Sequence, residues 1–185
     1  MLYTGSERET MMYEVKNGKL YFDGCDTTEL ARQYGTPLYV FSESDIVSRF
    51  GELKESFLNK WENTRVAYAC KAFCTPAMLK LVAREGMCID VVSGGELYAA
   101  IAAGFPAEGI EFNGNNKLPA ELEMAVDYGI GRIIIDSLQE LSLIEAICKE
   151  KGKKMKVLYR VTPGVQADTH DYIITGVSVV VLSNI

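Results

Sequence analysis

The sequence lacks several features that would assign it to a specialised class of protein. It contains no run of the roughly 20 apolar residues that a membrane-spanning helix needs, and Met1–Thr10 mixes charged and polar residues where a secretory signal would be apolar. Its 19 Lys and Arg are outnumbered by 25 Asp and Glu, which disfavours nucleic acid as a partner. These absences favour a cytoplasmic protein with neither a membrane nor a nucleic-acid partner.

Cysteine and histidine are too sparse and too scattered for a disulfide framework or a metal site. The five cysteines are odd in number and never form a CxxC pair, and His170 is the one histidine. We therefore predict no metal ion, and we expect reduced thiols that are mainly buried. His170 lies in a polar segment, where a solvated histidine is commoner than a catalytic one.

The first part of the chain carries short strand and helix signals. Lys19–Phe22 is expected to form a strand, and the residues from 28 to 34 a helix that Gly35 ends. Leu38–Phe41 is predicted to be a second strand. Apolar residues then recur at steps of three and four from Ile46 to Trp61, which predicts an amphipathic helix.

A regular alternation of strands and helices follows. Apolar strands are expected to end near residues 70, 91, 113, 136 and 161, and an amphipathic helix lies between each pair. Repeats of roughly 21 to 25 residues predict parallel strands with right-handed helical crossovers. Both a (β/α)₈ barrel and an open doubly wound sheet fit this pattern. A barrel needs about 250 residues, so five units would form an incomplete one.

Lys71 is a candidate for covalent chemistry because it directly follows the apolar strand Val66–Cys70. Strand alternation places Ala67 and Ala69 on the same face as Lys71, which leaves room for a bulky group. A lysine amine in such a pocket loses its proton more easily and can form a Schiff base. The alternative is a lysine that reaches into solvent from the end of a strand.

Several other polar residues admit two interpretations. Asp90 and Arg160 are charges inside apolar strands, so they either form an ion pair with each other or face a pocket. Ser93-Gly94-Gly95-Glu96 has the form of a helix-capping box, although adjacent glycines also let a ligand approach the backbone. Asn113–Lys117 is either an ordinary turn with a solvated lysine or part of a pocket lining.

Several segments together resemble the diaminopimelate decarboxylase family, whose members are alanine racemase-like, fold-type III pyridoxal-phosphate enzymes. The matching segments occur in the family's order and spacing: Tyr68-Ala69-Cys70-Lys71-Ala72, Asp90 to Leu97, Ala103 to Pro106, Gly114 to Lys117, Arg160 to Val165, and Thr169 to Gly176. One position departs from the pattern, because Asp168 stands where the family has a histidine.

The resemblance implies an α/β fold, a (β/α)₈ TIM barrel of the alanine racemase-like type with about five β/α units present. It also implies pyridoxal 5'-phosphate as cofactor, bound to Lys71, with Asp90, Ser93, Glu96 and Arg160 beside it. The activity implied is decarboxylation of meso-2,6-diaminopimelate to L-lysine by a homodimer. Alternatives are a relative that acts on ornithine, arginine or carboxynorspermidine, and a non-catalytic fragment.

The resemblance stops after Gly176, which predicts three parts. Residues 1–44 would pack against a C-terminal β domain, 45–176 would form the partial cofactor-binding barrel, and 177–185 would be an aberrant apolar tail. On this interpretation the chain is truncated, so we expect it to bind phosphate poorly and to lack activity alone. Its open strand edges would favour aggregation, unless Val177–Leu182 pairs with the last strand.

Overall fold

The computed structural model describes residues 12–161 and 179–180. By their internal contacts the residues divide into two compact units, Met1–Asn63 and Thr64–Ile185. Each unit is coherent in itself and is described separately below. The segment with His170 and most of the C-terminal apolar tail lie outside the described residues.

The first unit begins with a small antiparallel sheet in the order β1-β2-β3. β1 (Tyr13–Lys16) and β2 (Lys19–Phe22) form a hairpin, and β3 (Cys25–Asp26) follows. The hairpin turn is Asn17-Gly18, and both residues have positive φ, 53° and 73°. Two such residues form the turn whose twist matches the strands that it joins.

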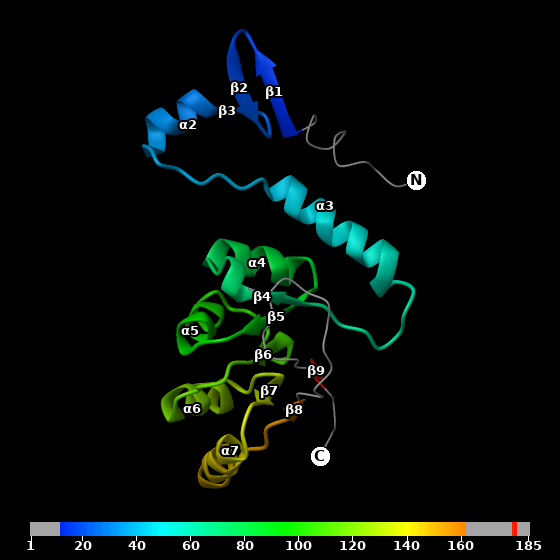
Figure 1. Ribbon diagram of the computed structural model, residues 1–185, viewed down its shortest axis with the longest axis vertical. Helices are drawn as coiled ribbons and strands as arrows, with labels where there is room; N and C mark the ends of the chain where they lie inside the picture. The colour runs from blue at the N-terminus through cyan, green and yellow to red at the C-terminus, as the bar shows by residue number, and fades with distance from the viewer. Residues whose placement is uncertain (1–11, 162–178, 181–185) are drawn as a thin grey trace. The chain divides into compact units, whose positions relative to one another are not determined.

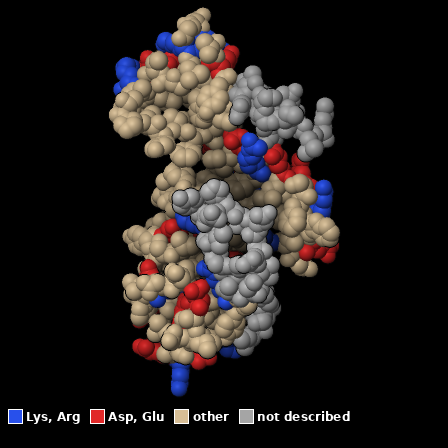
Figure 2. Space-filling view, in the orientation of Figure 1, with Lys and Arg blue, Asp and Glu red and all other residues tan. Residues whose placement is uncertain are grey.

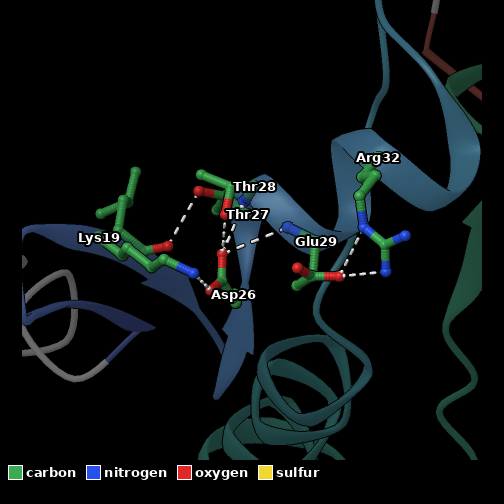
Figure 3. A network of polar contacts seen from close by, with 7 residues as sticks. Lys19, Asp26, Thr27, Thr28, Glu29 and Arg32 are labelled. Atoms are coloured by element: carbon green, nitrogen blue, oxygen red, sulfur yellow. Dashed lines mark hydrogen bonds and ion pairs between the residues drawn. The ribbon is translucent and has the colours of Figure 1, made fainter.

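Asp26 fixes the start of the first described helix, α2 (Thr27–Tyr34). Its carboxylate accepts hydrogen bonds from the backbone N–H and hydroxyl of Thr28 at 2.8 and 2.6 Å, and from the Lys19 ammonium at 2.8 Å (Figure 3). These donors hold the pKa of Asp26 well below its usual range, with the Lys19 hydrogen bond as the largest cause. Asp26 therefore satisfies the free N–H groups of the first helical turn while remaining ionised.

Two predictions in this unit are wrong. The residues of Leu38–Phe41 form no strand, and their side chains are exposed, Tyr39 at 89%. The amphipathic helix α3 (Glu43–Leu53) begins at Ser42, whose hydroxyl accepts from Asp45 N–H, and it ends in a π-helical turn at Lys54–Leu58. The helix therefore stops short of Trp61, because the wider turn breaks the three-and-four spacing.

The second unit has five parallel strands in chain order, β4 to β8, with one helix in each connection (Figure 1). The strands are β4 (Ala67–Ala69), β5 (Cys88–Val91), β6 (Ile110–Phe112), β7 (Arg132–Ile135) and β8 (Val157–Val161). The helices are α4 (Pro76–Arg84), α5 (Gly94–Ala102), α6 (Pro119–Tyr128) and α7 (Leu138–Lys151). The predicted β/α alternation is confirmed.

The two faces of this sheet differ in composition. Figure 1 shows α4 to α7 on one side of the strands. The residues that pack toward them are large, apolar and buried: Ile89, Val91, Ile110, Phe112, Ile133 and Ile135. The other face, called the inner face below, carries the alternate residues of each strand, including Asp90, Glu111 and Arg132. Apolar burial beneath the helices supplies most of the core, and Ile134 and Leu158 add buried apolar side chains on the inner face.

The sheet has a sixth strand, β9 (Val179–Val180), which pairs antiparallel with β8 at Arg160 and Val161. The sequence predicted that the apolar tail could pair here, and this pairing is confirmed for these two residues. A parallel sheet in strict chain order, with every helix on one side, is the arrangement of a barrel. A doubly wound sheet would carry helices on both sides.

The surface gives little indication of special partners. Figure 2 shows acidic and basic side chains interspersed over the visible face of the second unit. No helix among the described residues is long and apolar enough to cross a membrane.

All five cysteines are free, but Cys70 alone is buried and Cys25 is exposed, so the prediction of mainly buried thiols is wrong. Within residues 12–161 no three His, Cys, Asp or Glu side chains cluster as metal ligands.

Candidate active site

The candidate site lies on the inner face, where strand register aligns the charged residues of neighbouring strands. Ala69 pairs with Asp90, Asp90 with Glu111, and Glu111 with Arg132. Paired residues of parallel strands point to the same face. The Arg132 guanidinium contacts the Glu111 carboxylate at 3.2 Å, so Asp90 is left as the carboxylate of this row without an ion-pair partner among the described residues.

Lys71 lies two residues after the end of β4, whereas the sequence predicted that it would follow the strand directly. β4 ends at Ala69, and Lys71 is the middle residue of a short 3₁₀ turn, Cys70–Ala72, with its side chain exposed. Its positive charge nevertheless acts on Asp90 and favours the ionised carboxylate. The amine therefore lies close to the inner face, beside the half-buried alanines of β4.

Asp90 has an unsatisfied oxygen. Its Oδ1 is buried and has no hydrogen-bond partner among the described residues. Burial raises the pKa of Asp90, and the Asn113 side chain opposes this by a hydrogen bond. The Glu111 charge adds to the rise, and the Lys71 charge again opposes it. A buried acceptor without a donor is costly, and a ligand that donates a hydrogen bond would remove this cost.

We expect Asp90→Asn to stabilise the ligand-free protein by about 1 kcal/mol at neutral pH, because it removes a poorly solvated charge. Since the folded pKa is raised, the native state binds more protons than the unfolded state above the ordinary pKa. Asp90 therefore lowers stability as pH rises through its folded pKa. Unfolding measured at pH 7 and pH 4 should show the stabilising effect shrink at the lower pH. An equal stabilising effect at pH 7 and at pH 4 would contradict this prediction.

Ser93 caps α5 as its spacing predicted, and Glu96 bonds the backbone of the residue before the cap. The Ser93 hydroxyl accepts from Glu96 N–H at 3.2 Å, and Glu96 Oε2 accepts from Val92 N–H at 2.8 Å. These bonds satisfy backbone groups at the start of α5. The capping interpretation is confirmed. Glu96 also lies close enough to Asp90 for its charge to raise the pKa of that carboxyl, so capping does not remove it from the site.

Gly94, between these two residues, is a glycine for a reason that sequence inspection missed. A Cβ built at Gly94 would lie 2.6 Å from Oε1 and 2.7 Å from Cγ of Glu121, a residue of α6. The Glu121 carboxylate occupies this space because it accepts hydrogen bonds from Gly94 N–H at 2.7 Å and Leu118 N–H at 2.8 Å. The side chain that lies close to Gly94 thus belongs to the neighbouring β/α unit.

Gly94→Ala is expected to destabilise the protein by about 1–3 kcal/mol, because Glu121 must move and lose two hydrogen bonds. Gly95→Ala is the matched control. Its Cβ would meet nothing nearer than Ser93 Oγ at 3.9 Å, so the added helix propensity should stabilise by about 0.5 kcal/mol. Denaturant unfolding of both variants measures the difference. Similar effects at the two positions would show that Glu121 does not restrict Gly94.

Arg160 pairs with Asp136, its guanidinium lying 3.6 Å from the carboxylate. The alternative of an Asp90–Arg160 ion pair is therefore wrong. Two strands, β6 and β7, separate the strands that carry these residues. Arg160 follows Tyr159, which pairs with the buried Ile135, and alternation therefore places Arg160 on the inner face.

Lys117 is neither solvated nor free to bind a ligand. Its side chain is 1% exposed, and its ammonium donates to Gly114 O, Ile134 O and Glu140 Oε1 at 2.7, 2.7 and 2.6 Å. The interpretation of Lys117 as a solvated residue is wrong. Sequence reasoning could not have found these partners, because two are backbone carbonyls and the third lies 23 residues away.

Comparisons with known proteins agree with this geometry. Residues 43–179 match the family model described as pyridoxal-dependent decarboxylase, pyridoxal binding domain. The chain belongs to this family. The decarboxylase relatives include the diaminopimelate decarboxylase of Bacillus methanolicus, 53% identical over 87% of this chain and 37% of that protein. The Bacillus subtilis enzyme of the same name is 51% identical over the same shares.

Solved structures of decarboxylases place the fold in the same group. Diaminopimelate decarboxylase from Methanocaldococcus jannaschii superposes with a TM-score of 0.81 at 41% identity, over 90% of this chain and 39% of that one. The Helicobacter pylori enzyme, in complex with L-lysine, gives 0.75 at 33%, over 82% and 38%. The fold is therefore that of an incomplete TIM barrel. The chain spans under two fifths of the length of these decarboxylases.

Pyridoxal phosphate is the cofactor of this decarboxylase family, and the inner face fits it. The exposed amine of Lys71 suits an aldehyde, and the small side chains of Ala67 and Ala69 leave space for an aromatic ring. The unsatisfied Oδ1 of Asp90 would accept a hydrogen bond from a polar group on such a ring.

Proposed function

We propose that the protein carrying this chain decarboxylates meso-2,6-diaminopimelate to L-lysine. The observation that supports this most is the 53% identity with a diaminopimelate decarboxylase over 87% of the chain. A lysine/ornithine decarboxylase from Vibrio vulnificus shares the fold, with a TM-score of 0.61 over 72% of this chain, but it is only 24% identical. The preference for diaminopimelate over ornithine rests on this difference.

In this proposal Lys71 holds the cofactor through its aldehyde. Asp90 accepts a hydrogen bond from the ring or its substituents, and its raised pKa favours sharing a proton there. Ser93 and Glu96 fix the strand-to-helix turn beside the ring. Arg160, held by Asp136, presents positive charge on the inner face, where a carboxylate or phosphate would bind.

When bound, pyridoxal phosphate supplies the electron sink for the pair left by the departing carboxylate. The residues of this chain bind and orient. Lys71 would supply the amine that holds the cofactor, and Asp90 would lie beside it in a partly desolvated place, where the electrostatic effect of a charge is larger than in water. The apolar helix face keeps the strands rigid beneath these groups.

Assembly and location are also part of the proposal. We expect the intact protein to be a cytoplasmic homodimer with an amino-acid substrate and neither nucleic acid nor membrane as a partner. Residues 1–44 would pack against a C-terminal β domain, 45–176 would form part of the barrel, and 177–185 would be an aberrant apolar tail. The exposed side chains of Leu38–Phe41 suit such a contact.

Carbon dioxide release tests the substrate assignment. The protein that carries this chain, loaded with pyridoxal phosphate, should release carbon dioxide from meso-diaminopimelate and form L-lysine. Ornithine and arginine, at the same concentration, should react at least about a hundredfold more slowly. A faster reaction with either amino acid would assign the protein to another decarboxylase, and no reaction with any of the three would favour a non-catalytic role.

A further inference from the structure

Lys117 and Glu140 form a buried ion pair between two β/α units. The Lys117 side chain is 1% exposed and that of Glu140 9%. The three protons of the ammonium have three acceptors, and its Nζ also lies 5.6 Å from the centre of the Phe112 ring. A lysine so fully bonded has no proton left for a ligand. Its place in the polar loop after β6 therefore needs another explanation.

Glu140 connects Lys117 to the backbone of a second loop. While Oε1 accepts from Lys117, Oε2 accepts from Asp136 N–H at 3.0 Å. Since Lys117 also holds Gly114 O and Ile134 O, the pair joins the loop after β6 to the end of β7 and the loop that follows it. The loops at the carboxyl ends of two neighbouring strands are thus tied by one buried charge pair.

The same arrangement occurs one unit earlier. Glu121, at the third position of α6 as Glu140 is of α7, accepts from Leu118 N–H with one oxygen and from Gly94 N–H with the other. Each glutamate therefore bonds the loop before its own helix and a group of the preceding unit, which is Gly94 at the start of α5 for Glu121 and Lys117 for Glu140. Glu121 and Glu140 connect the loops after β5, β6 and β7 in series.

These loops position the residues of the candidate site. Asn113, whose side chain lowers the pKa of Asp90, begins the loop that Lys117 closes, and its own N–H donates to Val91 O at 2.8 Å. Asp136, which holds Arg160, donates its N–H to Glu140. The Lys117–Glu140 pair, called the clamp below, thus bonds Gly114, the neighbour of Asn113, and Asp136, the partner of Arg160. It bonds neither Asp90 nor Arg160 directly.

We infer that Lys117 is a positioning residue of the cofactor site, acting with Glu140 through the two loops that they join. The inference rests on the proposed function for the identity of the ligand. It assigns to Lys117 no contact with cofactor or substrate. A clamp made of charges, in place of apolar side chains, fixes the backbone carbonyls and N–H groups of the loops in direction as well as in position.

The test compares a variant without the clamp to one that is destabilised elsewhere. Lys117→Met together with Glu140→Gln removes the pair without leaving a buried charge alone. Ile147→Ala, two turns further along α7, removes a buried side chain that is 5% exposed. Both variants, and the unsubstituted protein, are titrated with pyridoxal phosphate well below their unfolding temperatures. Amide hydrogen exchange is followed in the ligand-free proteins.

The clamp variant should bind pyridoxal phosphate about tenfold more weakly and exchange the Asn113 and Asp136 amides faster. Ile147→Ala should change neither the affinity nor these two amides. Unchanged exchange at Asn113, or an equal loss of affinity in Ile147→Ala, would overturn the inference. If the unsubstituted protein binds no pyridoxal phosphate, the proposed function fails, and the exchange rates alone decide whether the clamp orders the loops.

Discussion

Lys71→Ala should abolish covalent attachment of pyridoxal phosphate to the protein. Borohydride treatment of the loaded protein should fix a pyridoxyl group on the peptide that contains Lys71, and mass spectrometry of that peptide should locate it. The physical reason is position, because Lys71 is an exposed amine beside the half-buried alanines of β4 and near the unsatisfied carboxylate of Asp90. Decarboxylation should be lost with the label.

Lys80→Ala is the control for this experiment, because Lys80 is an exposed lysine of the next helix, α4. Label and activity should both survive that substitution. Label that persists in Lys71→Ala, or that appears on Lys117 in the unsubstituted protein, would show that the cofactor is held elsewhere. The second outcome would also contradict the three hydrogen bonds that occupy the Lys117 ammonium.

Lys117→Met alone is expected to have the largest effect on stability, a loss of about 3–5 kcal/mol. The substitution leaves Glu140 buried without its counter-charge and two backbone carbonyls without a donor. Adding Glu140→Gln should restore part of the loss, because the lone charge is then gone. Denaturant unfolding of the two single variants and the double variant measures the coupling between the residues.

Lys153→Met provides the comparison at the surface. Lys153 also donates to two backbone carbonyls, Val126 O and Asp127 O, but its side chain is 42% exposed. Water can replace these bonds, so we expect a loss below about 1 kcal/mol. Equal effects of Lys117→Met and Lys153→Met would mean that burial of the Lys117–Glu140 pair contributes nothing.

The sequence predicted the second unit well because its signals are local. Helix starts carry Thr75, Ser93 and Ser137, and the side chain of each accepts a backbone N–H of the first turn. Helix ends carry Gly129 and Gly152 in left-handed conformation. Such signals depend on residues within one turn of each other, so a single sequence is enough to predict them.

Predictions failed where structure depends on distant residues or on packing. Leu38–Phe41 has the composition of a strand, but no described strand pairs with it. The partner of Arg160 could not be chosen among several acidic residues without the strand register. Lys117 was missed as a buried residue, since lysine is seldom buried and its partners are two carbonyls and a glutamate of α7.

Alternate residues of each β-strand face opposite sides of the sheet, so the two sets are restricted differently when residues are substituted in evolution. Residues such as Ile89, Ile110 and Ile133 are restricted by volume, because the helices pack against them without space to spare. Their neighbours Asp90, Glu111 and Arg132 are restricted by charge balance and by what binds beside them. Specificity can therefore diverge through every second residue while the intervening ones preserve the architecture, so one scaffold can serve different amino-acid substrates.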